Sequence, residues 1–216
     1  MHDPNNHDES RRSFLRTLVA APLAFAAPAV LGSAAACNDA SAGTLPIDTS
    51  QPTLACDDGD DDDATVAQTE GPYFTPNSPE RTSLLTAGVD GTTLLLTGFV
   101  VTRSCTPVAG ALLDFWQADE DGEYDNAGYT LRGHQYTAAD GTFRLETIVP
   151  GLYPGRTRHI HVKVQAPGRP ILTTQLYFPG ETRNASDGIF HESLLMKTTE
   201  GTNGRQAQFN FVLDIP

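Results

Sequence analysis

Residues 159–164, H-I-H-V-K-V, constrain the fold of this chain more than any other stretch. Successive side chains of a β-strand point to opposite faces, so Ile160 and the two valines that follow it can face an apolar core. His159 and His161 then lie on the other face, about 6.6 Å apart along the strand. Two imidazoles at this spacing can bind one metal ion, although an H-x-H pair is also compatible with a plain polar face. The stretch therefore predicts a strand and a candidate metal site.

The connection into this strand is rich in turn residues and in candidate site residues. Pro150-Gly151 fits a type II β-turn, which needs a positive φ at its third residue. Tyr153 lies six residues before His159, and Arg156 and Arg158 lie between them. We therefore expect a turn and a loop that carry one tyrosine and two arginines next to the histidine pair.

Short strands separated by turns are expected along most of the chain. Apolar or alternating segments predict further strands at residues 92–102, 108–116, 131–136, 142–148, 172–178 and 208–215. Asp140-Gly141 predicts that the segments on either side of it form a hairpin. Seven or eight strands with no convincing helix predict an all-β fold, an antiparallel β-sandwich.

The charge of the chain is acidic and uneven. The formal net charge is -13, and residues 57–63 alone supply six Asp. From Ala64 onward there are 16 acidic and 11 basic residues, a net of -5, without the basic stripe typical of nucleic-acid-binding proteins. Residues 37–66 are predicted to be an acidic flexible linker. A calcium loop is the alternative, but Gln68 stands where an EF-hand needs Glu.

Residues 1–36 have the features of an export signal. The pair Arg11-Arg12, followed by Phe-Leu, precedes an apolar run at 18–31 that is shorter than the ~20 residues of a membrane span. The arginine pair resembles a twin-arginine signal, which predicts a periplasmic or extracellular protein. Cleavage after Ala36 and lipidation of Cys37 both stay open, and lipidation would anchor the protein to a membrane.

The other two cysteines are Cys56 and Cys105. An even pair of cysteines in an oxidising compartment is a candidate disulfide. We therefore predict a Cys56–Cys105 disulfide, which leaves Cys37 as the odd cysteine.

Several short motifs occur in a fixed order through residues 67–215. They are T-E-G-P-Y at 69–73, P-V-A-G-A at 107–111, D-F-W-Q-A-D at 114–119, G-E-Y at 122–124, L-R-G-H-Q at 131–135, P-G-L-Y-P-G-R at 150–156, H-I-H at 159–161 and T-Q-L-Y-F at 174–178. Together they resemble the intradiol ring-cleavage dioxygenases, the group that contains protocatechuate 3,4-dioxygenase and catechol 1,2-dioxygenase. The chain looks most like short, exported, single-domain relatives, so residues 67–216 are expected to form a catalytic domain.

The resemblance implies one non-haem Fe(III) per chain. The four residues that match the family's iron ligands are Tyr124, Tyr153, His159 and His161. Tyrosinate is a hard anionic oxygen donor that suits a ferric ion, whereas zinc sites prefer Cys, His and carboxylate ligands. Catalytic roles are implied for Arg156, Gln175 and, as a base, Tyr153, and Pro72 and Tyr73 match residues that line the substrate pocket. Arg158 matches no family role.

The implied activity is cleavage of a catechol-type diol between its two hydroxylated carbons with O2, which gives a cis,cis-muconic acid. Larger catechol dioxygenases carry a helical N-terminal region that this sequence lacks, so a homodimer and the substrate's ring substituents stay open. The alternative is a non-catalytic carrier or adhesion module of the carboxypeptidase-regulatory or transthyretin-like type. P-V-A-G-A and P-G-L-Y also fit such modules, but a carrier has no need of four metal-compatible residues.

Overall fold

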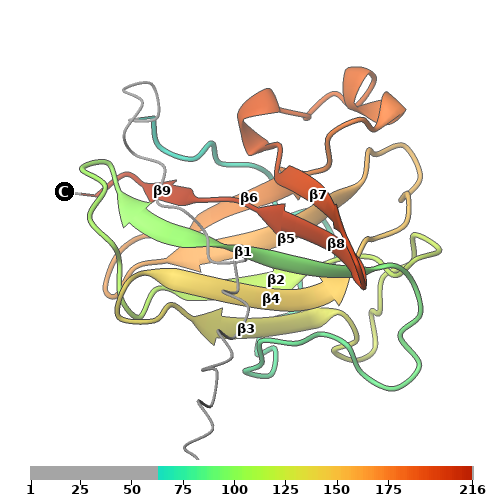
Figure 1. The fold of residues 1–216 in the computed structure, drawn as a ribbon, viewed down its shortest axis with the longest axis horizontal. Coiled ribbons are helices and arrows are strands. Elements are labelled where there is room, and N and C mark those ends of the chain that lie inside the picture. The colour runs from blue at the N-terminus through green and yellow to red at the C-terminus, as the bar shows by residue number, and fades with distance from the viewer. Residues whose placement is uncertain (1–62, 216) are drawn as a thin grey trace, which may run out of the picture. The chain divides into compact units, whose positions relative to one another are not determined.

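A computed structural model of the chain describes residues 63–215, drawn in colour in Figure 1. The predicted export signal, Cys37, Cys56 and most of the predicted acidic linker lie outside these residues. The disulfide, the lipidation and the export route therefore stay predictions. No helix among the described residues has the length and apolar character needed to cross a membrane.

Strands dominate residues 63–215, as the alternating segments predict. The strands are β1 (Thr93–Thr102), β2 (Leu112–Trp116), β3 (Arg132–Tyr136), β4 (Thr142–Ile148), β5 (His159–Gln165), β6 (Leu172–Tyr177), β7 (Lys197–Gly201), β8 (Gly204–Gln208) and β9 (Phe211–Leu213), and two short 3-10 helices are η1 (Thr182–Ala185) and η2 (Glu192–Leu194). Strand β7 has no buried residue. Neither β7 nor β8, whose one buried residue is Ala207, shows the apolar alternation by which the other strands are predicted. The strand predicted at 208–215 is shorter than expected, because β9 is limited to Phe211–Leu213.

Two sheets pack face to face in a sandwich, which confirms the predicted all-β class (Figure 1). One sheet has the order β3-β2-β5-β6, and all its pairs are antiparallel. The other has the order β4-β1-β8-β7, with β9 also paired to β1. Strand β1 is antiparallel to β4 but parallel to β8 and β9, so this second sheet is mixed.

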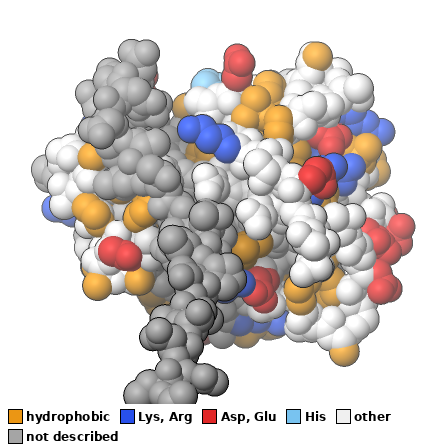
Figure 2. All heavy atoms as spheres, viewed as in Figure 1, with side chains coloured by type: hydrophobic (Ala, Val, Ile, Leu, Met, Phe, Trp, Pro, Cys, Tyr) orange, Lys and Arg blue, Asp and Glu red, His pale blue; other side chains and the backbone are white. Residues whose placement is uncertain are grey.

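The core lies between the two sheets. Strand β5 is an interior strand, and its residues Ile160, Val162 and Val164 are fully buried in the core, as the alternation predicts. The opposite face of β5 points out of the sandwich and carries the two histidines. On the face of the molecule seen in Figure 2, Lys and Arg side chains lie interspersed with Asp and Glu.

The predicted hairpin around Asp140-Gly141 is wrong. The turn forms, with Gly141 at a φ of 77°, but β3 pairs with β2 and β4 pairs with β1 in the other sheet. Each is the edge strand of its sheet, so the turn joins the two sheets along one side of the sandwich. A turn signal specifies a local chain reversal and does not specify which neighbour each strand pairs with.

The predicted strand at 108–116 is shorter than expected for a related reason. Pro107 bridges to Val101 and the Val108 N–H donates to the Val100 carbonyl, so this part belongs with β1. Only from Leu112 does the chain join the other sheet as β2. The apolar segment 108–116 is therefore divided between the two sheets.

Candidate metal centre

The two histidines of β5 face each other on the outer side of their sheet. The His159 and His161 side chains are buried, and their Nε2 atoms lie 3.1 Å apart. Nδ1 of His159 lies 2.6 Å from the Thr157 carbonyl oxygen, which can only accept, so Nδ1 carries the proton. Nε2 of His159 therefore presents its lone pair toward the space between the two rings.

The sheet register fixes the neighbours of His161. Trp116 on β2 and Gln175 on β6 are its cross-strand partners. The Trp116 ring stacks on the His161 ring with centroids 4.8 Å apart and planes 10° from parallel. Trp116 is buried against His161 on this outer face and is not part of the core between the sheets, and its stacked ring restricts the orientation of the imidazole.

The two predicted tyrosine ligands come from loops at the same end of the sheet. Tyr124, between β2 and β3, has its hydroxyl 3.3 Å from Nε2 of His159. Tyr153, between β4 and β5, has its ring centroid 5.9 Å from that of Tyr124. Tyr73 stacks on Tyr124 at 4.6 Å, and its hydroxyl lies 2.7 Å from the Tyr153 hydroxyl. The structure thus brings together the four predicted metal ligands and Tyr73.

Burial controls the protonation of these groups. It lowers the pKa of His159 to about 4 and lowers the pKa of His161 well below its usual value, because a buried imidazolium loses its solvation. Burial also raises the pKa of the Tyr124 phenol. The hydrogen bond with Tyr153 raises the pKa of Tyr73. Both imidazoles are therefore neutral at pH 7, which is the form that binds metals, and Tyr124 would ionise only beside a cation.

The donor set fits a metal ion. Two nitrogens bound to one ion at about 2.1 Å lie roughly 3.0–3.4 Å apart for bond angles near 90–109°, and the two Nε2 atoms are at 3.1 Å. Among residues 63–215 no group of three His, Cys, Asp or Glu side chains is placed to hold a metal ion, so a site built on the two histidines would need donors of another type, such as the adjacent tyrosines. Two phenol oxygens and two imidazoles are hard and borderline donors, a combination that suits Fe(III) better than zinc.

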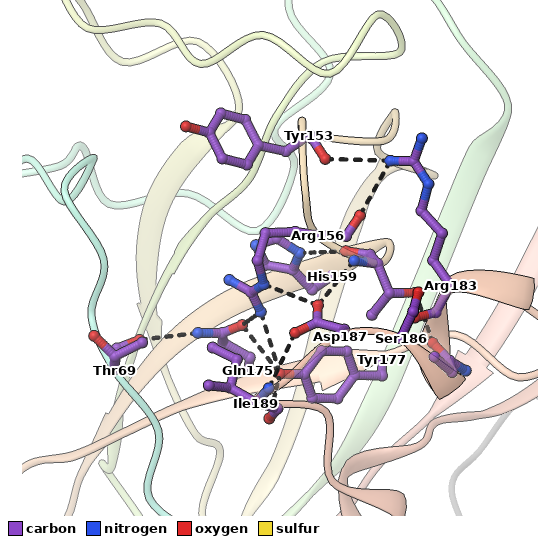
Figure 3. A network of polar contacts seen from close by, with 12 residues as sticks. Thr69, Tyr153, Arg156, His159, Gln175, Tyr177, Arg183, Ser186, Asp187 and Ile189 are labelled. Carbon is purple, nitrogen blue, oxygen red and sulfur yellow. Dashed lines mark hydrogen bonds and ion pairs between the residues drawn. The ribbon is translucent and has the colours of Figure 1, made fainter.

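Arg156 and Gln175 lie next to this centre and contact each other (Figure 3). Nη2 of Arg156 donates to Oε1 of Gln175 at 2.7 Å, and Nε2 of Gln175 donates to the Thr69 carbonyl oxygen at 2.9 Å. Nε of Arg156 forms an ion pair with Asp187 at 2.8 Å. The two residues predicted to act on substrate are thus held in one polar network.

A model of the family described as Dioxygenase matches residues 69–215 of this chain. The chain belongs to the intradiol ring-cleavage dioxygenases. It is 60% identical to the dioxygenase domain of a fusion with a carbohydrate-binding protein from Streptomyces sp. SirexAA-E, over 71% of this chain and 100% of that one, with a TM-score of 0.70.

Two further relatives are more distant. The 3-chlorocatechol 1,2-dioxygenase of Rhodococcus opacus 1CP is 30% identical over 70% of this chain and 73% of that one, with a TM-score of 0.64. The hydroxyquinol 1,2-dioxygenase of Nocardioides simplex is 29% identical over 65% of this chain. The present chain spans 56% of that relative's length.

Two residues of the site escaped the sequence-based prediction. Tyr177 lies two positions after Gln175 on the same face of β6, and its hydroxyl is 3.4 Å from Nη2 of Arg156. Burial raises its pKa to about 12. The strand alternation could have indicated Tyr177. The second residue is Asp187, which lies in the loop between β6 and β7 and belongs to none of the family motifs quoted above.

Pro72 and Arg158 stand apart from the cluster. Pro72 is exposed, on the segment that passes over His161: a Cβ built on neighbouring Gly71 would lie 3.5 Å from Cε1 of that ring. Its place in the substrate pocket stays a prediction. Arg158 forms an ion pair with Glu181 at 2.8 Å and donates to the Pro150 carbonyl oxygen. It thus has an ion-pair partner other than that of Arg156.

The predicted type II turn at Pro150-Gly151 is wrong, because the φ of Gly151 is not positive. The turn lies four residues later, where the Arg156 N–H donates to the Tyr153 carbonyl oxygen at 3.1 Å and Gly155 has a φ of 79°. Gly151 is needed for a different reason. A Cβ there would lie 2.3 Å from the Gly122 nitrogen and 2.4 Å from the Glu120 carbonyl oxygen.

Gly151→Ala is therefore expected to destabilise the fold. The added methyl group would collide with backbone atoms that cannot rotate away, and overpacking of this kind costs ~1–3 kcal/mol. Gly188→Ala is the matched control, because a Cβ there meets nothing within 4 Å. Urea unfolding of both variants measures the difference. Equal midpoints would contradict the packing role of Gly151.

Proposed function

We propose that this chain is a non-haem Fe(III) intradiol dioxygenase. It would cleave a catechol-type diol between its two hydroxylated carbons with O2 and give a cis,cis-muconic acid. The observation that carries the proposal is the convergence of Tyr124, Tyr153, His159 and His161 at one end of one sheet. The names of the relatives, chlorocatechol and hydroxyquinol 1,2-dioxygenases, support a substrate of the same class.

The two phenols and two imidazoles would hold one iron per chain. When bound, Fe(III) would supply a Lewis acid for the diol oxygens and the electronic coupling to O2 that side chains lack. The side chains supply proton transfer, charge and exclusion of water.

Tyr153 is the candidate base of the site. Either hydroxyl can donate the 2.7 Å hydrogen bond between Tyr153 and Tyr73. If Tyr153 becomes a phenolate, the Tyr73 hydroxyl can still donate to it. A general base must lie within hydrogen-bond reach of the proton that it takes, and the diol would bind on the same side as this hydroxyl. Tyr73 would therefore stabilise Tyr153 in the form that accepts a proton.

Arg156 is the candidate electrostatic group. Its guanidinium is fixed by Asp187 and Gln175, so it would meet the negative charge of the bound diol without reorganising. Preorganised cations of this kind stabilise charge as it develops during a reaction.

The segment that carries Tyr73 covers the centre and limits access of water. Phe74 packs on Trp116 with centroids 4.9 Å apart, and Trp116 in turn packs on His161. The ammonium of Lys163 lies 4.0 Å from the centre of the Phe74 ring and forms an ion pair with Glu70. These contacts attach the segment to the outer face of β5. A carrier module gives no reason for two buried imidazoles whose Nε2 atoms face each other at 3.1 Å.

The proposal is tested by metal analysis and by turnover. Protein expressed with iron available should contain about one iron per chain and be wine-red, because tyrosinate donates charge to Fe(III). Catechol, chlorocatechol and hydroxyquinol are offered with O2, and the product is measured as the muconic acid that carries the ring substituent of each diol. Colourless protein that binds zinc and no iron, and that forms no muconic acid, would refute the proposal.

Arg156→Ala should keep iron and colour but lose turnover. Removing one preorganised charge-stabilising donor costs ~10²–10³ in rate. Arg158→Ala is the matched control, since Arg158 also precedes His159 and also has a carboxylate partner, Glu181. Its rate should stay close to that of the parent. If instead Arg156→Ala cleaved catechol at the parent rate and Arg158→Ala did not, the roles of the two arginines would be exchanged.

A further inference from the structure

Asp187 contacts Arg156 and the backbone of Thr157, the residue whose carbonyl oxygen contacts His159 (Figure 3). It lies in the loop between β6 and β7, and its side chain is 2% exposed. Oδ2 accepts from Nε of Arg156 at 2.8 Å and from the backbone N–H of Thr157 at 2.8 Å, while Oδ1 accepts from the Ile189 N–H at 3.1 Å. One carboxylate oxygen therefore fixes a side chain and the backbone of the next residue.

Thr157 transmits this contact to the metal centre. Its carbonyl oxygen accepts the proton on Nδ1 of His159 at 2.6 Å, so the position of the Thr157 backbone sets the direction of the imidazole. The same loop holds Thr157 a second time, because the Thr157 hydroxyl donates to Oδ1 of Asn184 at 2.6 Å. Partners of this kind fix the tautomer and orientation of a metal-binding histidine.

Two of the three guanidinium nitrogens of Arg156 donate to other residues of the protein, and the third is left to donate to a ligand. Nε goes to Asp187, and Nη2 goes to Gln175 and, at 3.4 Å, to the Tyr177 hydroxyl. Nη1 has no hydrogen-bond partner within residues 63–215. With two of its three nitrogens held, the guanidinium cannot turn, and Nη1 is the donor that remains.

Asp187 is ionised in this setting. Although burial alone would raise its pKa, hydrogen bonds from the Thr157 and Ile189 backbone and from Arg156 outweigh burial and lower it. A charged acceptor makes a stronger and more directional hydrogen bond than a neutral one. An asparagine could not replace it, because its amide would place a donor against one of the three N–H groups.

We propose that Asp187 is a positioning residue that orients Arg156 and His159 together, so that Nη1 of Arg156 is presented to the bound diol. The inference deepens the proposed function and rests on it for the identity of the substrate. Asp187 itself touches neither the diol nor the metal ligands, and it acts through Arg156 and through the Thr157 backbone.

The chain provides a matched control in the Arg158–Glu181 ion pair. It joins the same two segments, has the same 2.8 Å distance, and is comparably shielded on the arginine side. Arg158 does not reach Gln175 or Tyr177, its second contact is the Pro150 carbonyl oxygen, and its partner Glu181 is 20% exposed where Asp187 is 2% exposed. Loss of Glu181 therefore reports the cost of breaking an ion pair between these segments without disturbing Arg156.

The experiment compares iron-loaded parent protein with Asp187→Asn, Glu181→Gln, Arg156→Ala and the double variant Arg156→Ala/Asp187→Asn. Iron per chain is measured first, and kcat and KM for catechol are expressed per bound iron. Asp187→Asn should lower kcat by up to about 10²-fold, the loss typical of a displaced catalytic group, and should lower iron content through His159. Glu181→Gln should do neither. In the Arg156→Ala background Asp187→Asn should add much less, because residues that act through each other are not additive.

Parent kcat per iron in Asp187→Asn, or an undiminished further loss in the Arg156→Ala background, would overturn the inference. A crystal structure of the parent with 4-nitrocatechol, kept free of O2, gives a readout that needs neither a variant nor turnover. Nη1 of Arg156 should be its donor nearest to a ring oxygen, and contact through Nε or Nη2 would contradict the proposal. If the parent protein binds iron and 4-nitrocatechol in this way but cleaves no diol, the proposed function is wrong and the positioning role of Asp187 is still supported.

Discussion

His161→Ala is expected to abolish iron binding and, with it, ring cleavage. The substitution removes one of four protein ligands, and the buried imidazole stacked on Trp116 would be replaced by an apolar gap. Substitution of a residue that only supports a metal ligand already costs about 10–100-fold in metal affinity. Loss of the ligand itself should therefore cost more. Iron per chain after dialysis measures the effect.

His134→Ala is the control for this substitution. His134 lies on β3 of the same sheet, where its Nδ1 is 3.1 Å from the Ser78 hydroxyl and away from the two histidines of β5. The His134→Ala variant should retain iron at the parent level. Retention of iron by His161→Ala would mean that the centre has been assigned to the wrong residues.

Tyr153→Phe is expected to separate metal binding from turnover. The variant keeps Tyr124, His159 and His161, so a measurable fraction of the iron should remain, and the visible spectrum should shift because one tyrosinate is lost. Turnover should fall further, since a positioned general base typically contributes ~10²–10⁴-fold. The measurements are iron per chain, the visible spectrum and muconic acid formed per iron.

Tyr129→Phe is the comparison for Tyr153→Phe. Tyr129 is an exposed loop tyrosine whose hydroxyl donates to the Pro76 carbonyl oxygen. The Tyr129→Phe substitution should leave the visible spectrum and the rate of ring cleavage unchanged. A spectrum that shifted with Tyr129→Phe but not with Tyr153→Phe would require a different tyrosine in the site.

The central strand and its two faces could be predicted because strict alternation has few structural solutions. Ile160 and Val162 can only face a core, and this forces His159 and His161 onto one side. The approach of Trp116 and Gln175 to His161 follows from sheet register, which depends on pairing between distant strands. Family motifs in the sequence contain Trp116, Gln175 and His161, but they do not predict that these three residues are neighbours in the sheet.

Other features depend on tertiary structure that no local pattern encodes. Pro150-Gly151 and Pro154-Gly155 carry the same turn signal, and only the second forms the turn, whereas Gly151 packs closely against the Gly122 backbone. Strand β7 is solvent-exposed on nearly all its residues, so it shows no apolar period. Asp187 reaches Arg156 across 31 residues of sequence, through a loop whose course is set by the fold.

The two loops that carry Tyr124 and Tyr153 meet through backbone atoms. The Gly151 and Gly122 N–H groups both donate to the Asp119 carbonyl oxygen, at 2.5 and 3.2 Å. The two loops are thus joined by main-chain contacts, in addition to the side-chain contacts that Tyr73 makes with both phenols. Under the proposed function, substitutions at an exposed position such as Pro72 would change which ring substituents fit without removing these main-chain contacts. The backbone link between the two tyrosine loops would be retained, so the proposed function predicts that substrate range can change while the metal ligands are kept.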